Sequence, residues 1–369
     1  MAEIIKSPKE RAVLVGLARN SLDRPGVEES IAELTELSLS AGAQVDYTFI
    51  QTRTVDPKFY IGKGLVEQIR QNISANGANL VIFDDPLSPA QQRNLENVFE
   101  IKVIDRSMLI LNIFAQNART AAAKLQVELA QLEYMLPRLT GFWSHFSRQY
   151  GGIGTRGPGE TQLETDRRQV RAKIASLKKK IEKLSTQRDI QRRSRQNLFK
   201  VSLIGYTNAG KSTLFNRLTR SSVTTADKLF TTLDSTSRVM SQGYPDKIIF
   251  TDTVGFIKKL PTQLVESFKS TLEEVTYADL LLHVIDFSDR NCEEKMRQTQ
   301  LILDDIGAGN VEKLLIYNKI DKTDRDFGKP VDINRVFFVS ALKETGLESL
   351  KEELTLRLKR FGACKYKVS

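Results

Sequence analysis

The residues with the clearest chemistry in this sequence form a glycine-rich loop between an apolar strand and a helix. The segment KVSLI (200–204) runs directly into eight residues of the pattern G-x-x-x-x-G-K-S, and TLFNRLTR follows. In this context the pattern predicts a phosphate-binding loop, because glycines let backbone amides converge on phosphate oxygens at the positive end of the helix. The residues that we expect to hold nucleotide here are Gly205, Tyr206, Thr207, Asn208, Ala209, Gly210, Lys211, Ser212 and Thr213.

Two side chains of this loop have definite roles in phosphate chemistry. We expect Lys211 to bridge the β- and γ-phosphates as a catalytic group, and the Ser212 hydroxyl to ligate Mg²⁺. A second Mg²⁺ contact is predicted at Asp252, which follows the apolar strand KIIF (247–250) and can hold the ion through water. An aspartate after a strand is also common in simple turns. The metal-binding interpretation of Asp252 therefore depends on the phosphate loop that precedes it in the sequence. Three residues later, the amide of Gly255 is predicted to act in catalysis by donating to the γ-phosphate.

A further Mg²⁺ ligand is expected from the segment LFTTLDST (229–236). A threonine in this position closes its hydroxyl over Mg²⁺ while the γ-phosphate is present. Thr232 is the favoured residue for this metal and catalytic role, and Thr231 is its near rival. Loss of the γ-phosphate would release this segment and the one after Gly255, so hydrolysis would become a conformational signal.

The base is predicted by a third element. The strand LLIYN (314–318) ends in Asn318-Lys319-Ile320-Asp321. A carboxylate at Asp321 accepts from the N1–H and the exocyclic amine of guanine, which adenine does not offer as a pair. After the strand RVFFV, Ser340 and Ala341 follow, where a backbone amide would meet guanine O6. In this order after a phosphate loop, the pattern predicts GTP and GDP as the ligands.

The elements that position these residues indicate an α/β fold. Strand-like segments at 11–17, 44–52, 79–84 and 102–105 alternate with helical patterns at 29–40, 65–75 and 88–98. Such alternation predicts βαβ units and a mostly parallel sheet. We therefore expect an N-terminal α/β domain at 1–117, a helical hairpin at 118–198 and a C-terminal P-loop GTPase domain at 199–369.

The middle segment predicts an antiparallel helical hairpin with a glycine-rich tip loop at 141–160. Two apolar stripes at helical spacing would zip it together; they are Leu125, Leu129, Leu132 and Leu136, then Val170, Ile174, Leu177, Ile181 and Leu184. Thr161 and Glu164 have the spacing of a capping box that would restart the helix. Glycines, aromatics and arginines in the loop suit contacts with unpaired RNA bases, the alternative being aromatics that fold back on the hairpin.

The net charge of the 369-residue chain, +10, lies entirely between Arg167 and Arg195. That stretch has twelve basic residues and only Glu182 and Asp189 as acids. A polyanionic partner is the favoured explanation, and a solvated helix face is the alternative.

Composition excludes several other classes. No apolar run reaches the roughly 18 residues that span a bilayer, so no stable membrane insertion is expected. The N-terminal MAEIIKSPKE lacks the apolar core of a secretory signal, and Cys292 and Cys364 lack metal-type spacing, which together suggest a cytoplasmic protein. Two histidines, His145 and His283, leave little for a histidine-based zinc site or triad.

These motifs together resemble the HflX family of ribosome-associated GTPases, over nearly the whole chain. The N-terminal motifs are ESIAELTELSLSAGA, FYIGKGLVEQI, VIFDDPLSPAQQRNLE and VIDRSMLILNIFAQNA; the hairpin motifs are LQVELAQLEYMLPRLTG and GGIGTRGPGETQLETDRR. The C-terminal motifs are GYTNAGKSTLFN, LFTTLD, DTVGF, NKID and SAL. The resemblance implies binding to the large ribosomal subunit and its rRNA, with the hairpin tip near the peptidyl-transferase region, and splitting or rescue of stalled ribosomes under stress.

Three details qualify this resemblance. Phe256 stands where many GTPases place a glutamine that orients water, so intrinsic turnover should be slow and depend on something supplied on docking. Asn208 resembles a K⁺-binding position of potassium-stimulated GTPases, with a loop-capping amide as the alternative. Some family members carry an additional C-terminal domain, and ribosomal contacts of such a domain are not expected in a chain that ends shortly after LESLKEELTLRLKR.

The expectation is a monomeric GTP-hydrolysing switch that associates with the large ribosomal subunit. The alternative is a nucleotide-stabilised RNA-binding or ribosome-assembly scaffold with little hydrolysis.

Overall fold

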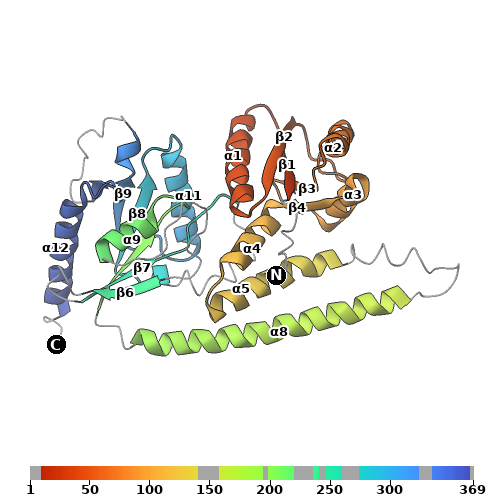
Figure 1. Cartoon of the computed structure of the whole chain (residues 1–369). Helices are drawn as coiled ribbons and strands as arrows, with labels where there is room; N and C mark the ends of the chain where they lie inside the picture. The colour runs from red at the N-terminus through yellow and green to blue at the C-terminus, as the bar shows by residue number, and fades with distance from the viewer. Residues whose placement is uncertain are drawn as a thin grey trace, which may run out of the picture. The chain divides into compact units, whose positions relative to one another are not determined.

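Figure 1 shows the computed structural model of the chain, which describes residues 10–139, 158–193, 198–219, 236–240, 247–259, 274–323 and 335–365. These residues form two compact units. The first holds the described part of Met1–Gln116 with Lys124–Ile181, and the second holds Asn117–Ala123 with the described residues from Glu182 onward. The predicted tip loop, apart from its last three residues, and the rival threonines Thr231 and Thr232 lie outside the described residues.

The first unit is built on a four-stranded parallel sheet of order β2-β1-β3-β4. Its strands are β1 (Arg11–Ala18), β2 (Gln44–Thr52), β3 (Leu80–Phe83) and β4 (Lys102–Asp105). Its helices are α1 (Arg24–Ser40), α2 (Lys63–Asn76), α3 (Pro89–Phe99) and α4 (Arg106–Asn117). The first three helices and all four strands match predicted segments to within a few residues, whereas no pattern predicted α4.

Different helices cover the two faces of this sheet, with α1 on one side and α2 and α3 on the other (Figure 1). Side chains alternate between faces along a strand, and Val13 and Val15 join the apolar side chains of α2 and α3 in one buried cluster. On the opposite face, a Cβ added to Gly16 would lie 2.9 Å from Val27 Cγ1 of α1. Gly16 therefore lets α1 approach the strand closely.

A buried arginine stands where the carboxyl ends of β3 and β4 lie side by side. Arg106 is 1% exposed and donates its Nε to Asp84 Oδ1 at 3.0 Å. It also donates to the carbonyl oxygen of Ser30 at 2.6 Å and lies 3.4 Å from the Glu33 carboxylate. Asp84 is fully buried, so Arg106 compensates a carboxylate that has lost its water.

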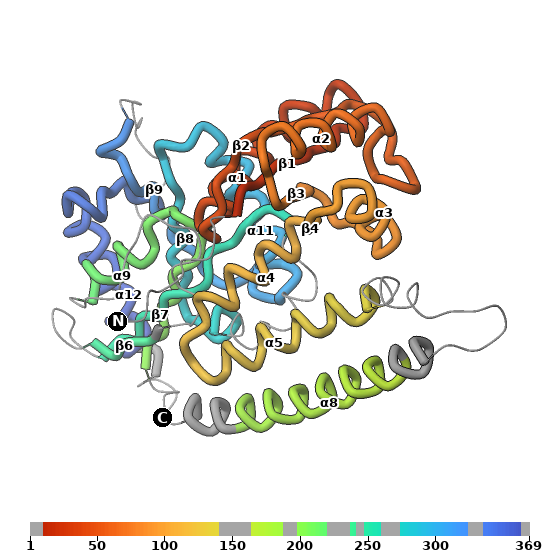
Figure 2. The backbone as a smooth tube through the Cα atoms, turned by 45° about the vertical axis from the view of Figure 1, so that its right-hand side comes forward, coloured from red at the N-terminus to blue at the C-terminus, as the bar shows by residue number. Residues whose placement is uncertain are grey.

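The middle of the chain is a pair of helices that lie side by side and run in opposite directions (Figure 2). Its elements are α5 (Ala121–Met135), the 3-10 helix η1 (Leu136–Arg138) and α8 (Pro158–Arg193). Two ion pairs join them: Lys173 lies 2.6 Å from Glu128, and Lys178 lies 2.8 Å from Glu133. The predicted antiparallel hairpin is confirmed.

The apolar stripe predicted for α8 is its least exposed face. Its five members, from Val170 to Leu184, are buried or half-buried, whereas the residues between them are exposed. On α5, only Leu129 of the predicted leucine stripe is buried. The other buried residues of α5 are Ala123, Gln126, Val127, Ala130 and Tyr134. α5 therefore has two apolar faces, and the leucine pattern identified the less buried one.

The start of α8 differs from the prediction. The helix begins at Pro158, three residues before the predicted capping residue Thr161. The predicted capping box of Thr161 and Glu164 is therefore wrong, because both residues lie inside the helix. Pro158 explains the earlier start, since proline has a helical φ and no amide to leave unsatisfied in the first turn.

The cationic face predicted for α8 lies at the surface. Besides Lys173 and Lys178, five of its basic side chains are exposed; they are Arg168, Arg171, Lys179, Lys180 and Lys183. Exposed basic residues along one long helix are the kind of surface that a polyanion contacts through its phosphates.

The second unit is built on a six-stranded sheet of order β10-β9-β8-β5-β7-β6, in which only β6 is antiparallel to its neighbour. Its strands are β5 (Phe199–Ile204), β6 (Thr236–Met240), β7 (Ile248–Asp252), β8 (Leu280–Asp286), β9 (Lys313–Asn318) and β10 (Val336–Phe338). Its helices are α9 (Lys211–Thr219), α11 (Cys292–Asp305), the 3-10 helix η2 (Ile320–Lys322) and α12 (Leu347–Lys365).

Two clusters hold this sheet between its helices. Leu203 and Val284 of the central strands pack with the apolar faces of α9 and α12 in the larger cluster. On the opposite face Ile204 and Leu281 pack with Leu303 of α11. The predicted fold class is thereby confirmed: a parallel-sheet α/β unit, a helical hairpin and a P-loop nucleotide-binding fold. The domain boundaries at 117 and 198 stay predictions. Among the described residues, no helix has the length and apolar character required to cross a membrane.

The Arg106 network yields a stability prediction. Arg106→Met should lower the free energy of unfolding of the first unit by about 3–5 kcal/mol, because the Asp84 carboxylate stays buried without its cation. Urea unfolding of the full chain, followed by far-ultraviolet circular dichroism, measures the change. Arg70→Met is the matched control, since Arg70 pairs with Glu67 at the surface of α2 and should leave the transition unchanged.

Candidate nucleotide site

The predicted site residues meet at one edge of the second sheet. β5, β7, β9 and β10 all present their carboxyl ends there, because β5, β7, β8, β9 and β10 are parallel. The chain adds β7 on one side of β5 and β8 on the other, so the order reverses at β5. Ligands of open α/β sheets bind outside the carboxyl ends at such a reversal. The phosphate loop stands at this point.

The backbone conformation of the phosphate loop requires glycine or asparagine at three of its positions. Gly205 has φ +140°, and a Cβ there would lie 2.1 Å from the carbonyl oxygen of Val284. Gly210 has φ +91°, and its added Cβ would lie 2.2 Å from Asn318 Nδ2. Asn208 is left-handed at φ +59°, a conformation that asparagine tolerates. That conformation agrees with the loop-capping alternative, and the K⁺ site at Asn208 stays a prediction.

Lys211 is buried at the centre of the loop. Its Nζ donates to the carbonyl oxygens of Gly205 at 3.0 Å and Tyr206 at 2.7 Å. Burial lowers the pKa of Lys211 to about 8, while the Asp252 carboxylate acts in the opposite direction. The ammonium group is therefore held by neutral acceptors that phosphate oxygens would replace.

Ser212 and Asp252 provide an oxygen donor pair beside this lysine. The Ser212 hydroxyl donates to Asp252 Oδ2 at 2.6 Å, and Asp252 is fully buried at the end of β7. The next residue, Thr253, fixes the chain by donating its hydroxyl to the carbonyl oxygen of Leu203 at 2.6 Å. A hydroxyl and a carboxylate are hard donors that suit Mg²⁺, which takes further ligands from phosphate and water. The residues present fit the predicted metal.

The segment after Asp252 is tied to the loop through its backbone. The amide of Thr207 donates to the carbonyl oxygen of Phe256 at 2.8 Å, and the amide of Phe256 donates to that of Gly205 at 3.1 Å. A Cβ on Gly255 would lie 2.8 Å from Thr207 Cα and 3.0 Å from Lys211 Nζ, so no side chain fits there. Gly255 thus stands directly against the residues expected to surround the γ-phosphate.

The Phe256 ring points into the protein. It is 2% exposed and belongs to an apolar cluster with Tyr206 and residues from β8 and α11. Tyr206 is itself buried, with Lys295 Nζ 4.9 Å from its ring centroid. Phe256 therefore has neither the chemistry nor the direction to orient a water molecule at the phosphate.

Asn318 joins the base side of the site to the phosphate side. Its Nδ2 donates to the carbonyl oxygen of Ala209 at 2.9 Å, and its Oδ1 accepts from the amide of Ala341 at 2.9 Å. Asn318 is 2% exposed, so both bonds are shielded from water. The Ala341 amide, expected at guanine O6, is engaged by Asn318 here, and its contact with guanine stays a prediction.

Asp321 is held ready to accept hydrogen bonds. The Ser340 hydroxyl donates to Asp321 Oδ1 at 2.6 Å, and this bond is the main cause that lowers the pKa of Asp321. The ionised carboxylate is the form that accepts from guanine. The sequence predicted Ser340 near the base because a backbone amide at Ser340-Ala341 was expected to meet guanine O6. Nothing in the sequence predicted that the Ser340 side chain would bind Asp321.

Lys319 has a partner that the sequence did not reveal. Its Nζ lies 2.7 Å from Asp286 Oδ2, at the end of β8, and its backbone is left-handed at φ +65°. The acid of this pair could have been found as the aspartate that ends the apolar strand LLLHVID. Of the remaining predicted residues, Thr207 lies in the loop and Thr213 in the first turn of α9, whereas Thr232 falls outside the described residues.

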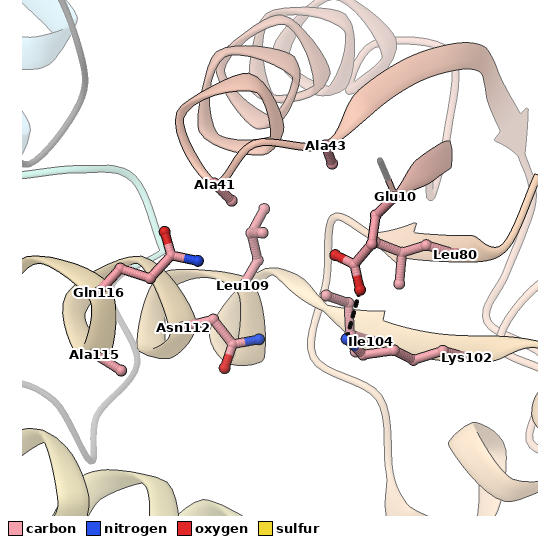
Figure 3. Close-up of a pocket in the computed structure, with 10 residues that line it drawn as sticks. All are labelled: Glu10, Ala41, Ala43, Leu80, Lys102, Ile104, Leu109, Asn112, Ala115 and Gln116. Carbon is pink, nitrogen blue, oxygen red and sulfur yellow. Dashed lines mark hydrogen bonds and ion pairs between the residues drawn. The ribbon is translucent and has the colours of Figure 1, made fainter. Parts of the chain in front are cut away.

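A separate cavity of about 310 Å³ lies in the first unit (Figure 3). It opens at the amino ends of β3 and β4, where Leu80 and Lys102 line it, and Glu10 pairs with Lys102 at 3.1 Å. Asn112 and Gln116 of α4 line the opposite wall. None of the predicted nucleotide residues borders this cavity, so it is no part of the nucleotide site.

A P-loop, an Asp–Ser donor pair and an Asn-Lys-x-Asp turn on one sheet edge define a P-loop GTPase. A family model described as "50S ribosome-binding GTPase" matches residues 200–319. Models described as "GTP-binding GTPase N-terminal" and "GTP-binding GTPase Middle Region" match 28–115 and 117–195.

The whole chain also resembles named relatives. It is 45% identical to "GTPase HflX" of Caldanaerobacter subterraneus subsp. tengcongensis over 96% of this chain and 82% of that one. It is 46% identical to "GTPase HflX" of Escherichia coli over 89% of this chain and 79% of that one. A GTP-binding protein from Sulfolobus solfataricus, crystallised with GDP, has a similar fold, with 26% identity, a TM-score of 0.50 and coverage of 95% and 99%. The chain belongs to the HflX family of GTPases, as its motifs predicted.

The buried lysine yields a prediction about pH. Bound phosphates require the ammonium form of Lys211, which the nucleotide-free chain loses as pH rises through about 8. The dissociation constant for GDP should therefore rise about twofold from pH 7 to 8 and about fivefold more from pH 8 to 9, or about tenfold in all. Calorimetry in buffers of different ionisation enthalpy should show proton uptake on binding above pH 8. In Lys211→Arg, whose guanidinium keeps its proton, the rise should be absent; a rise as steep as that of the wild type would contradict the assignment.

Proposed function

We propose that this chain is a monomeric cytoplasmic switch that hydrolyses GTP, binds the large ribosomal subunit and its rRNA, and splits or rescues stalled ribosomes. The observation that carries the proposal is the junction at Asn318. One buried amide connects the loop that would hold the phosphates with the turn that would select guanine. The family model named for 50S ribosome-binding GTPases matches this same part of the chain.

The residues divide into three groups by role. Lys211, with the loop amides, holds the β- and γ-phosphates, and Gly255 donates its amide to the γ-phosphate. Ser212, Asp252 and Thr232 hold Mg²⁺, which supplies charge neutralisation on the phosphates. Asp321, Ser340 and Ala341 select guanine, with Asn318 and Lys319 holding their loop.

The buried Phe256 supports a switch that depends on its partner. No glutamine stands at this position, and the phenyl ring is packed against Tyr206. A group or ion supplied on docking must then complete catalysis, as arginine fingers do in other GTPases. The exposed basic face of α8 supports rRNA as the docking partner.

Base selection gives the first test of this proposal. Asp321→Ala removes the acceptor for two guanine donors, so GDP affinity should fall about a hundredfold or more. Affinity for ADP should stay unchanged, so the preference for guanine shrinks by the same factor. Titration with fluorescently labelled GDP and ADP measures both. Asp305→Ala at the exposed end of α11 is the matched control. A variant at Asp321 that still prefers guanine as strongly as the wild type would refute the assignment.

Stimulation by ribosomal subunits gives the second test. GTP turnover in K⁺ and Mg²⁺ should rise at least about tenfold with large subunits, the scale of a supplied catalytic group. The double variant Lys179→Glu/Lys180→Glu should weaken this stimulation and flatten its salt dependence, because fewer phosphates are neutralised. The charge-matched control Lys359→Glu/Arg360→Glu changes exposed residues of α12 and should leave stimulation intact.

Sedimentation of intact ribosomes separates the proposal from the scaffold alternative. The proposal expects subunit peaks to grow with GTP or a non-hydrolysable analogue and not with GDP. A scaffold would bind subunits equally with every nucleotide and show negligible turnover, and that outcome would overturn the proposed function.

A further inference from the structure

Arg138 links the end of α5 to the first sheet. Arg138 is the last residue of η1, directly after α5, and its side chain is 13% exposed. The predicted tip loop, 141–160, begins three residues after Arg138 in the sequence. Its contacts therefore bear on how the end of α5 is held.

The guanidinium of Arg138 contacts three elements at once. Nε donates to Gln92 Oε1 of α3 at 3.2 Å, and one Nη donates to the carbonyl oxygen of Leu87 at 2.8 Å. The other Nη donates to the carbonyl oxygen of Tyr134 in α5 at 2.9 Å. The group also stacks on the Tyr134 ring, with Cζ 3.6 Å from the ring centroid. A planar fork with fixed donors satisfies all of these contacts in one rotamer, which a lysine does not.

The acceptors of Arg138 are themselves fixed. Asp105 ends β4, is almost fully buried, and lies 3.6 Å from Arg138. Its carboxylate accepts from the amides of Leu87 at 3.1 Å and Met108 at 2.9 Å. The arginine thus binds to the rigid carboxyl edge of the sheet, while Arg106 occupies the neighbouring position there.

We propose that Arg138 is a positioning residue that fixes the root of the hairpin on the first sheet, so that the hairpin engages rRNA in one orientation. The inference rests on the proposed ribosome binding. Arg138 is not placed in GTP chemistry, because its contacts with Leu87, Gln92, Asp105 and Tyr134 lie within the first unit. Its loss should therefore change the affinity for large subunits and leave the chemical step unchanged.

The test is GTP turnover of the full chain against the concentration of large subunits. In Arg138→Met the subunit concentration for half-maximal stimulation should rise about tenfold, the effect of one lost charge-assisted contact on a docking group. Intrinsic turnover and the maximal stimulated rate should stay within about twofold of the wild type. Arg138→Lys keeps the charge and should recover part of the affinity, and Arg70→Met on α2 should behave as wild type.

Hydrogen exchange without ribosomes supplies a second readout. Peptides covering 84–92 and 131–139 should exchange faster in Arg138→Met, whereas peptides covering 199–219 should not change. If Arg138→Met does not fold, Arg138→Lys carries the test with a smaller shift of the same kind. Unchanged half-maximal concentrations in both variants, or an equal loss of intrinsic and stimulated turnover, would overturn the inference.

The two proposals fail in different ways. A wild-type chain that large subunits never stimulate would remove the proposed function. A wild-type chain that is stimulated, together with an Arg138→Met variant of unaltered affinity, would remove only the role of Arg138.

Discussion

The nucleotide site depends on the two hydrogen bonds of the buried Asn318 side chain. Ala209, Asn318 and Ala341 are more than a hundred residues apart from first to last, yet one amide group joins the phosphate loop to the turn beyond β10. The contact is close enough that Gly210 has no room for a Cβ. Gly210 of the phosphate loop must therefore be a glycine for two reasons. Its backbone would approach the phosphates, and the Asn318 side chain leaves no room for a larger residue. Under the proposed function, the residues that hold the phosphates and those that select guanine are therefore joined by hydrogen bonds into one unit.

The two sheets of the chain use the same edge in opposite ways. In the second unit the carboxyl ends of the strands surround groups that offer hydrogen bonds and charge to a ligand. In the first unit the corresponding edge is occupied by the protein itself. Arg106 binds Asp84, and Arg138 binds next to Asp105, with all four side chains almost withdrawn from water. The carboxylates at this edge are therefore neutralised by arginines of the protein and not by a ligand. This arrangement suits a rigid support for the hairpin better than a second small-molecule site.

The sequence predicted most of the fold and the core of the site because both have short-range signals. Period-two and period-3.6 patterns located β2 and β4 to the residue, and the loop motif located Lys211 and Ser212. α4 was not predicted because it is apolar on nearly every side, from Leu109 to Phe114, and therefore shows no amphipathic period. The start of α8 was misplaced because Pro158 outweighed the capping box. Asp286 had only the weak signal of an aspartate at the end of an apolar strand, and the side-chain role of Ser340 had none. Their partners Lys319 and Asp321 are distant in sequence and meet them only because of the strand order.

The burial of Phe256 links the GTPase site to the rest of the proposed cycle. A residue bonded on both sides to the loop backbone, through Gly205 and Thr207, moves only if the loop moves with it. Its ring also packs with Tyr206 and with Leu303 of α11, so turning it toward the phosphate would expose apolar surface and open the cluster. The chain therefore cannot generate a water-orienting group at this position by rotating a side chain. Under the proposed function, the group that orients the water has to come from the docked partner. Slow GTP hydrolysis by the free protein then follows from the packing of Phe256 in the core.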